Sequence, residues 1–149
     1  MAKSKAKILV VDDNNGIRAA LGLLLPMHFA QVELIPSPKE LVSRLADFRP
    51  DVVLLDMNFH TDINTGNEGL FWLSEIKKRC EDVEVVLFTA YADIQLAVEG
   101  MKRGAFDFVV KPWDNENLIE ILKAAYANRS KEAREASAAS ASSIKMHWG

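Results

Sequence analysis

The chain has 149 residues with 18 basic and 21 acidic side chains, so its formal net charge is −3 when the histidines are neutral. Apolar residues make up 49% and charged residues 26%, which excludes a collagen-like chain, a wholly disordered chain and a polybasic nucleic-acid tail. A chain of this size buries roughly 70% of the surface that its unfolded form exposes, so we expect one domain that needs no disulfide. The single cysteine, Cys80, agrees, because it has no intrachain partner and favours a reducing compartment.

No membrane or export segment is expected. The longest apolar stretch, residues 19–27, is far shorter than the roughly 20 residues that a membrane helix needs. The basic N-terminus precedes only a short apolar run, residues 8–11, which ends in two aspartates and does not resemble a signal peptide. We therefore expect a cytoplasmic protein.

Strand-like and helix-like segments alternate along the chain. In chain order, the strand-like runs are residues 8–11, 31–35, 52–55, 83–88 and 106–110, and the stretches with helical spacing that follow each run are residues 17–25, 41–48, 70–76, 94–101 and 118–125. Four of the runs lack alternation, which is typical of strands buried on both faces. The run 31–35 alternates in part and stops at Pro36, which indicates a strand at the sheet edge.

The alternating order predicts an α/β fold with a mostly parallel sheet, right-handed crossovers and helices on both faces. We place the domain at residues 5–128. The segment 129–149 is first charged and then rich in Ser and Ala, so we expect a helical extension, a linker tail or the start of a larger region. Three apolar residues of that segment have no packing partner that the sequence identifies: Ile144, Met146 and Trp148.

Polar side chains follow the strand-like runs at the points where these runs end. The first run ends in Asp12 and Asp13, the third in Asp56, the fourth in Thr89 and the fifth in Lys111. Because the carboxyl ends of parallel strands meet at one edge of the sheet, we expect these side chains to lie together. Three close carboxylates repel one another unless a cation lies among them, and Mg²⁺ fits best because it favours oxygen ligands.

The lysine and the hydroxyl beside this acidic group indicate phosphoryl transfer. That reaction requires a nucleophile in line with the phosphorus and positive charge around the equatorial oxygens. Asp56 is the candidate nucleophile, since a carboxylate can form an aspartyl phosphate. Lys111 would pair with a phosphoryl oxygen, and the Thr89 hydroxyl would donate a hydrogen bond to another.

Four motifs follow one another in the chain: Ile-Leu-Val-Val-Asp-Asp at 8–13, Val-Leu-Leu-Asp at 53–56, Leu-Phe-Thr-Ala at 87–90 and Val-Lys-Pro at 110–112. Together they resemble the signature of receiver domains of response regulators from two-component signalling. The resemblance covers residues 5–128. It implies a flavodoxin-like (βα)5 fold with a five-stranded sheet of order 2-1-3-4-5.

The same resemblance assigns the acidic residues by position. It implies that Asp56 is the phosphoacceptor and receives a phosphoryl group from the phosphohistidine of a histidine kinase. Asp12, Asp13, Asp56 and the backbone carbonyl of Asn58 would then bind Mg²⁺. The loop after Asp56, residues 58–67, is longer than is usual in the family and lacks the common Met-Pro pair.

The resemblance also implies a conformational switch. Thr89 would be the switch hydroxyl, Lys111 the lysine that pairs with the phosphoryl group, and Tyr91 the aromatic switch residue. Phosphorylation would draw Thr89 toward the phosphoryl oxygens and turn Tyr91 inward, which would alter the face made by residues 92–128. We expect the output face to include Ile94, Val98, Met101, Phe108 and Trp113. Ordinary packing remains an alternative role for Tyr91 and Trp113.

A narrower resemblance is carried by Thr-Ala-Tyr at 89–91, Gly-Ala-Phe-Asp-Phe at 104–108 and Lys-Pro-Trp-Asp at 111–114. These stretches resemble receivers of sigma-54-dependent, nitrogen-regulation-type transcription activators. An ATPase domain and a DNA-binding domain follow the receiver in those proteins, and neither fits into the remaining residues. We therefore expect a regulatory module whose partners are a sensor histidine kinase, absent output domains and a second copy in a phosphorylation-dependent homodimer.

Other interpretations stay open from the sequence. The chain could be a stand-alone receiver, a kinase-fused receiver, or a pseudo-receiver that acts without phosphorylation. An aspartyl-phosphate phosphatase would place an Asp-x-Asp arrangement after the first strand, where this chain has adjacent Asp12 and Asp13. A flavin-binding module would need a Ser/Thr/Gly-rich phosphate loop there. Direct DNA binding is not expected, because no basic stripe is present.

Overall fold

The computed structural model describes residues 3–57 and 68–129. The predicted metal ligand Asn58, the long loop 58–67 and the tail 130–149 lie outside the described residues. No helix among the described residues is long and apolar enough to cross a membrane.

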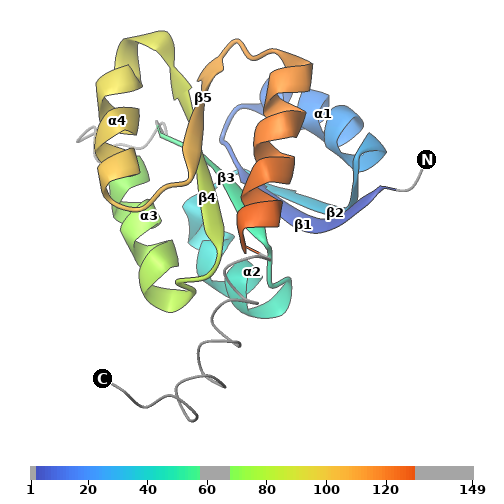
Figure 1. Cartoon of the computed structure of the whole chain (residues 1–149), viewed down its shortest axis with the longest axis horizontal. Coiled ribbons are helices and arrows are strands. Elements are labelled where there is room, and N and C mark those ends of the chain that lie inside the picture. Colours follow the sequence, from blue (N-terminus) through green and yellow to red (C-terminus); the bar gives the residue numbers. More distant parts are fainter. Residues whose placement is uncertain (1–2, 58–67, 130–149) are drawn as a thin grey trace, which may run out of the picture.

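Five parallel strands form one sheet in the order β2-β1-β3-β4-β5 (Figure 1). The strands are β1 Ser4–Val11, β2 Phe29–Ile35, β3 Val52–Asp56, β4 Glu84–Ala90 and β5 Asp107–Lys111. The helices are α1 Asn15–Leu24, α2 Leu41–Asp47, α3 Glu68–Arg79, α4 Ile94–Lys102 and a C-terminal helix whose described part spans residues 115–129. Short 3₁₀ turns occur at Leu25–Met27, Pro38–Glu40 and Tyr91–Asp93. The predicted fold class and strand order are confirmed.

The sheet separates two hydrophobic clusters, because side chains alternate between its faces. One cluster packs β-strand residues against α2, α3 and α4, with Leu45, Leu73 and Ala97 as fully or almost fully buried members. The other packs the opposite face against α1 and the C-terminal helix through Leu21 and Leu122. Helices therefore cover both faces, as the alternating sequence predicted.

The structure corrects the prediction that four strands are buried on both faces. β3 is buried throughout, and β4 is buried except at Ala90. β5 instead has a single buried residue, Val109, with half-buried neighbours on either side. The reason is its position at the sheet edge beside β4, where side chains lack a second neighbouring strand.

Helix α4 packs unusually close to the sheet through Gly100. A methyl group built on this glycine would overlap the side chain of Leu87 in β4 and lie 3.5 Å from Leu73 Cδ2 in α3. Gly100 itself is buried, whereas Val98 and Met101 of the same helix are 43% and 36% exposed. The absence of a side chain at position 100 thus determines how near α4 lies to the core.

The last described turn of the C-terminal helix is held at the edge of the sheet where the strands begin. Arg129 forms ion pairs with Asp51 at 3.0 Å and with Asp82 at 3.1 Å. Asn128 donates a hydrogen bond to the carboxylate of Glu84, the first residue of β4. These contacts connect the end of the helix to segments more than forty residues away, just before β3 and around the start of β4.

Candidate functional site

A pocket of about 260 Å³ lies at the carboxyl ends of the strands. Its lining comes from the segment after β1, the start of α1, and the last residues of β3, β4 and β5: Asp12, Asp13, Asn14, Ile17, Asp56, Ala90 and Lys111. In an open parallel sheet this edge is the usual place for ligands, because loops diverge there on opposite sides. The three predicted carboxylates and the predicted lysine thus reach one cavity.

Asp12 is fully buried, and its polar groups are held from several directions. Its main-chain N–H donates to the carbonyl oxygen of Ile35 at 3.1 Å, which extends the pairing of β1 with β2. Its Oδ1 accepts from the N–H of Asn14 at 2.9 Å, and its Oδ2 accepts from Lys111 Nζ at 2.8 Å. Buried carboxylates need such partners, because water no longer stabilises their charge. The carboxylate is therefore held in place before any ligand arrives.

Lys111 crosses from the edge strand to the centre of the site. Its Nζ lies 2.8 Å from Asp12 Oδ2 and 3.1 Å from Asp56 Oδ1. On the way it passes over the ring of Phe88 in β4, with Nζ 4.7 Å from the ring centroid, within the range of a cation–π contact. The peptide bond from Lys111 to Pro112 is cis.

The acidic residues fit a hard divalent cation. Asp12, Asp13 and Asp56 each offer a carboxylate oxygen, and these oxygens lie within 4.8 Å of one another. Octahedral Mg²⁺ binds oxygens at about 2.1 Å, so two opposite ligands stand roughly 4.2 Å apart. Three carboxylates and one lysine carry a formal charge of −2, which a divalent cation would neutralise. The spacing and the chemistry of the donors both suit Mg²⁺.

Thr89 and Tyr91 lie next to the pocket but are not part of its lining. The Thr89 side chain is 1% exposed, and its hydroxyl donates to the carbonyl oxygen of Ala90 at 3.3 Å. Tyr91 begins a 3₁₀ turn before α4 and is 79% exposed. In this structure Thr89 is therefore buried beside the pocket, whereas Tyr91 lies at the surface.

The predicted output residues are exposed or half-buried, and they lie on α4, on β5 and just after β5. Val98 and Met101 are exposed on α4, and Ile94 is half-buried at its start. Phe108 packs against the cluster under α2, α3 and α4. Trp113 packs against the other cluster, with its ring centroid 5.3 Å from that of Phe88. The shared role of the five residues as an output face stays a prediction.

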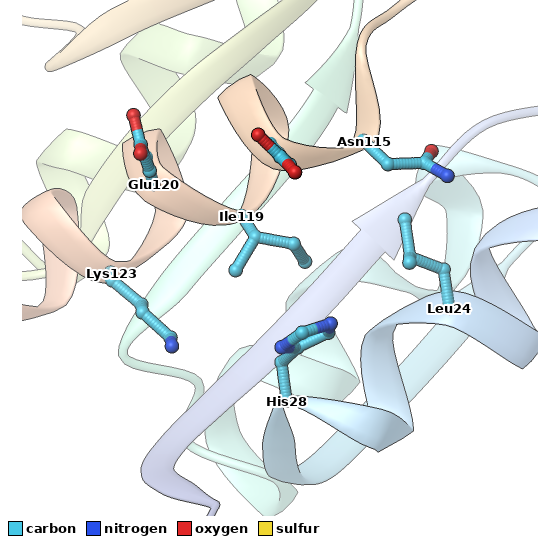
Figure 2. A pocket seen from close by; sticks show the side chains of 7 residues that line it. Leu24, His28, Asn115, Ile119, Glu120 and Lys123 are labelled. Atoms are coloured by element: carbon cyan, nitrogen blue, oxygen red, sulfur yellow. The ribbon is translucent and has the colours of Figure 1, made fainter.

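A second pocket, of about 210 Å³, lies between the end of α1 and the C-terminal helix (Figure 2). Leu24 and Ile119 supply apolar side chains, while His28, Glu120 and Lys123 surround them with titratable groups. It is distinct from the acidic pocket, because none of its lining residues is shared.

The sequence interpretation missed three residues at the acidic site. Asn14 caps α1, with Oδ1 accepting from the N–H of Ile17 at 2.9 Å, and also binds Asp12 through its own N–H. The motif Asn-Asn-Gly after the aspartates could have indicated this cap. Arg18 contacts the carbonyl oxygen of Asp12, and Phe88 lies beneath Lys111. Neither contact has a local sequence signal.

Comparison with known proteins identifies the family. Residues 8–123 match the family model of the response regulator receiver domain. This chain belongs to that family. The receiver is 30% identical over 143 residues to the regulatory protein AtoC of Escherichia coli, an alignment that covers 96% of this chain and 30% of AtoC. It is also 30% identical over 125 residues to the DNA-binding transcriptional regulator NtrC of Salmonella typhimurium, covering 84% of this chain and 26% of NtrC.

Solved structures agree with this assignment. A signal receiver domain from Bacteroides fragilis is 56% identical, with a TM-score of 0.76, over 83% of this chain and 98% of that one. NtrX from Brucella abortus, crystallised with ATP, is 31% identical with a TM-score of 0.77, over 89% of this chain and 29% of NtrX. The receiver spans about a third of the length of the curated relatives that it matches. The predicted family is confirmed, and the transcription-regulator relatives agree with the narrower resemblance.

Proposed function

We propose that this receiver is a phosphorylation-controlled switch in which Asp56 accepts a phosphoryl group from the phosphohistidine of a sensor histidine kinase. The supporting observation is that Lys111 contacts both Asp12 and Asp56 in a pocket lined by three carboxylates. This arrangement offers a nucleophile, a cation-binding pair of acids and a fixed positive charge around one small volume. Each is required for phosphoryl transfer.

The proposed reaction balances without a further reactant. An Asp56 carboxylate oxygen attacks the phosphorus, the phosphorus–nitrogen bond breaks, and its electron pair stays on the imidazole nitrogen of the kinase. Asp56 becomes an acyl phosphate. Lys111 moves its hydrogen bond from Asp56 Oδ1 to a phosphoryl oxygen and remains paired with Asp12, so the new charge is matched without a large movement.

Asp12, Asp13 and Asp56 would hold Mg²⁺, together with the backbone carbonyl of Asn58, which the family resemblance assigns. The bound ion would supply positive charge to the phosphoryl oxygens as the phosphorus is attacked. Asp12 is already oriented by Asn14 and Lys111, so part of this site is organised in advance.

The switch proposal concerns Thr89 and Tyr91. The Thr89 hydroxyl makes one long hydrogen bond, 3.3 Å, to a neighbouring carbonyl, which a phosphoryl oxygen would replace with a stronger, charge-assisted bond. Tyr91 is exposed in this structure, and it would turn inward when Thr89 moves. The differential contact with the phosphoryl group would shift the population toward the active state and alter the face made by residues 92–128.

The receiver would then control an output domain. We propose that the output is an ATPase and DNA-binding region of a transcription activator, since the relatives AtoC and NtrC are a regulatory protein and a DNA-binding transcriptional regulator. Phosphorylation would change self-association of the receiver or its contact with that region. A cytoplasmic location would follow from such a role.

Intact mass spectrometry after incubation with acetyl phosphate and Mg²⁺ tests the acceptor. The wild type should gain one phosphoryl adduct, and Asp56→Asn should gain none. Asp47→Asn is a matched control, because Asp47 is an exposed acid of α2 that pairs with Arg44 and lies outside the acidic pocket. Omitting Mg²⁺ should abolish the adduct. If neither the wild type nor the control gains an adduct, a pseudo-receiver becomes the better interpretation.

The switch is tested separately with Thr89→Ala. This variant should still form the adduct, because Thr89 does not line the pocket, but phosphorylation should no longer change the sedimentation of the chain. Thr89→Ser keeps the hydroxyl and should retain the response. A phosphorylation response in Thr89→Ala equal to that of the wild type would refute the proposed coupling.

A further inference from the structure

Arg18 connects the second turn of α1 to the end of β1. Its Nη1 donates to the main-chain carbonyl oxygen of Asp12 at 2.8 Å, and its Nη2 donates to the Asn15 side chain. Asp12 is fully buried, so its carbonyl oxygen gains a charged partner that shields it from the cost of burial. The guanidinium is held at both ends of its planar fork, which restricts its direction.

Arg18 holds the peptide that joins the two neighbouring aspartates of the acidic pocket. Successive residues of a strand point to opposite faces, yet Asp12 and Asp13 both line the acidic pocket. β1 ends at Val11, so the chain has already left the regular strand at the Asp12–Asp13 peptide. Because that peptide is planar, the direction of the Asp12 carbonyl also sets the starting point of Asp13. Asn14 and Lys111 hold the Asp12 carboxylate, and Arg18 holds the peptide that leads to Asp13.

We propose that Arg18 is a positioning residue for the divalent-cation site: it orients the Asp12–Asp13 peptide so that both carboxylates face the cation. This inference rests on the proposed function, because it assumes that the acidic pocket binds Mg²⁺. Arg18 acts through Asp12 and Asp13 and does not itself contact the cation.

A purely electrostatic role makes the opposite prediction. A guanidinium beside three carboxylates repels a cation, so removing its charge alone would tighten Mg²⁺ binding. Loss of positioning would instead weaken Mg²⁺ binding, because the cation would then have to order the Asp12–Asp13 peptide as it binds, and this ordering costs free energy. The sign of the change in Mg²⁺ affinity therefore separates the two roles.

The test is a titration of the whole chain with MgCl₂, without a phosphodonor, followed by backbone amide shifts in NMR spectra. Arg18→Gln should weaken the dissociation constant for Mg²⁺ by about 10-fold, the lower end of the range for groups that orient metal ligands. Arg18→Lys keeps the charge but not the fork, so its loss should be smaller. Arg103→Gln is the matched control: Arg103 pairs with Glu99 at the surface of α4, so this variant should bind Mg²⁺ like the wild type.

Thermal unfolding of the same variants in EDTA separates positioning from general stability. A merely structural role would lower the melting temperature and leave Mg²⁺ affinity unchanged, and that result overturns the inference. Equal or tighter Mg²⁺ binding by Arg18→Gln overturns it as well, while the proposed function stands. If the wild type binds no Mg²⁺, the proposed function fails and the inference falls with it. If Arg18→Gln does not fold, the Mg²⁺ affinity of Arg18→Lys tests the inference: weaker binding than the wild type supports it, and equal binding overturns it.

Discussion

Replacing Asp56, the proposed phosphoacceptor, should make the domain more stable while it abolishes phosphorylation. Asp56 is 3% exposed, and its carboxylate is crowded by those of Asp12 and Asp13. Asparagine has nearly the same shape, so Asp56→Asn removes the charge with little change in packing. In the absence of Mg²⁺ we expect the variant to unfold at higher temperature and higher urea concentration than the wild type.

The magnitude follows from the distances in the site. At an effective dielectric constant of about 20, each carboxylate within 4.8 Å repels Asp56 by at least about 3.5 kcal/mol. The attraction of Lys111 at 3.1 Å is about 5 kcal/mol in the same medium. Asp56→Asn loses both repulsions and the attraction of Lys111, so these three pairs together give a net gain of about 1–2 kcal/mol. For a chain of this length that corresponds to a rise of roughly 3–6 °C in melting temperature.

Urea and thermal unfolding in EDTA, followed by circular dichroism, measure this difference. Asp47→Asn is the control of opposite sign, because it breaks an exposed ion pair with Arg44 and should lose no more than about 1 kcal/mol. Added Mg²⁺ should stabilise the wild type more than Asp56→Asn, since the variant lacks one ligand. An Asp56→Asn variant equal to or less stable than the wild type in EDTA would refute the argument from carboxylate repulsion.

Two further predictions concern packing and the C-terminal helix. In urea unfolding, Gly100→Ala should destabilise the domain by about 1 kcal/mol or more, because overpacking outweighs the gain in helix propensity. Gly22→Ala should instead stabilise it by up to about 1 kcal/mol, because the nearest atom to the added methyl group is 3.8 Å away. A change of the same sign in both variants would contradict this. In double-mutant cycles, the coupling of Arg129 with Asp51 should exceed its coupling with Asp82, because Asp51 is 16% exposed and Asp82 is 54% exposed. The reverse order would show that burial does not control these ion pairs.

The site acids could be predicted from the sequence because their positions depend on topology alone. Asp12, Asp13 and Asp56 each follow an apolar run, and parallel strands bring their carboxyl ends to one edge. Lys111 could be placed there for the same reason. Its reach to Asp12 and Asp56 could not, because that depends on the path of a long side chain over Phe88 in the intervening strand.

Strand limits and burial were predicted less well. β1 begins at Ser4, four residues before the apolar run, because Ser4 pairs with Phe29 of β2 through main-chain groups that carry no hydropathy signal. β5 contains the apolar run Phe108, Val109 and Val110 but lies at the edge. The local sequence indicates which residues favour strands, whereas the number of neighbouring strands depends on the order of the strands in the sheet.

The sequence by itself determined the alternation of strands and helices, the family, and the side chains that the strand ends deliver to one edge. Those features depend on local spacing and on the order of elements along the chain. Only the tertiary structure decided the contacts of Arg18 with Asp12 and of Arg129 with Asp51 and Asp82. Such contacts join long, flexible side chains to groups from other elements, and their directions are set only when the surrounding backbone has packed.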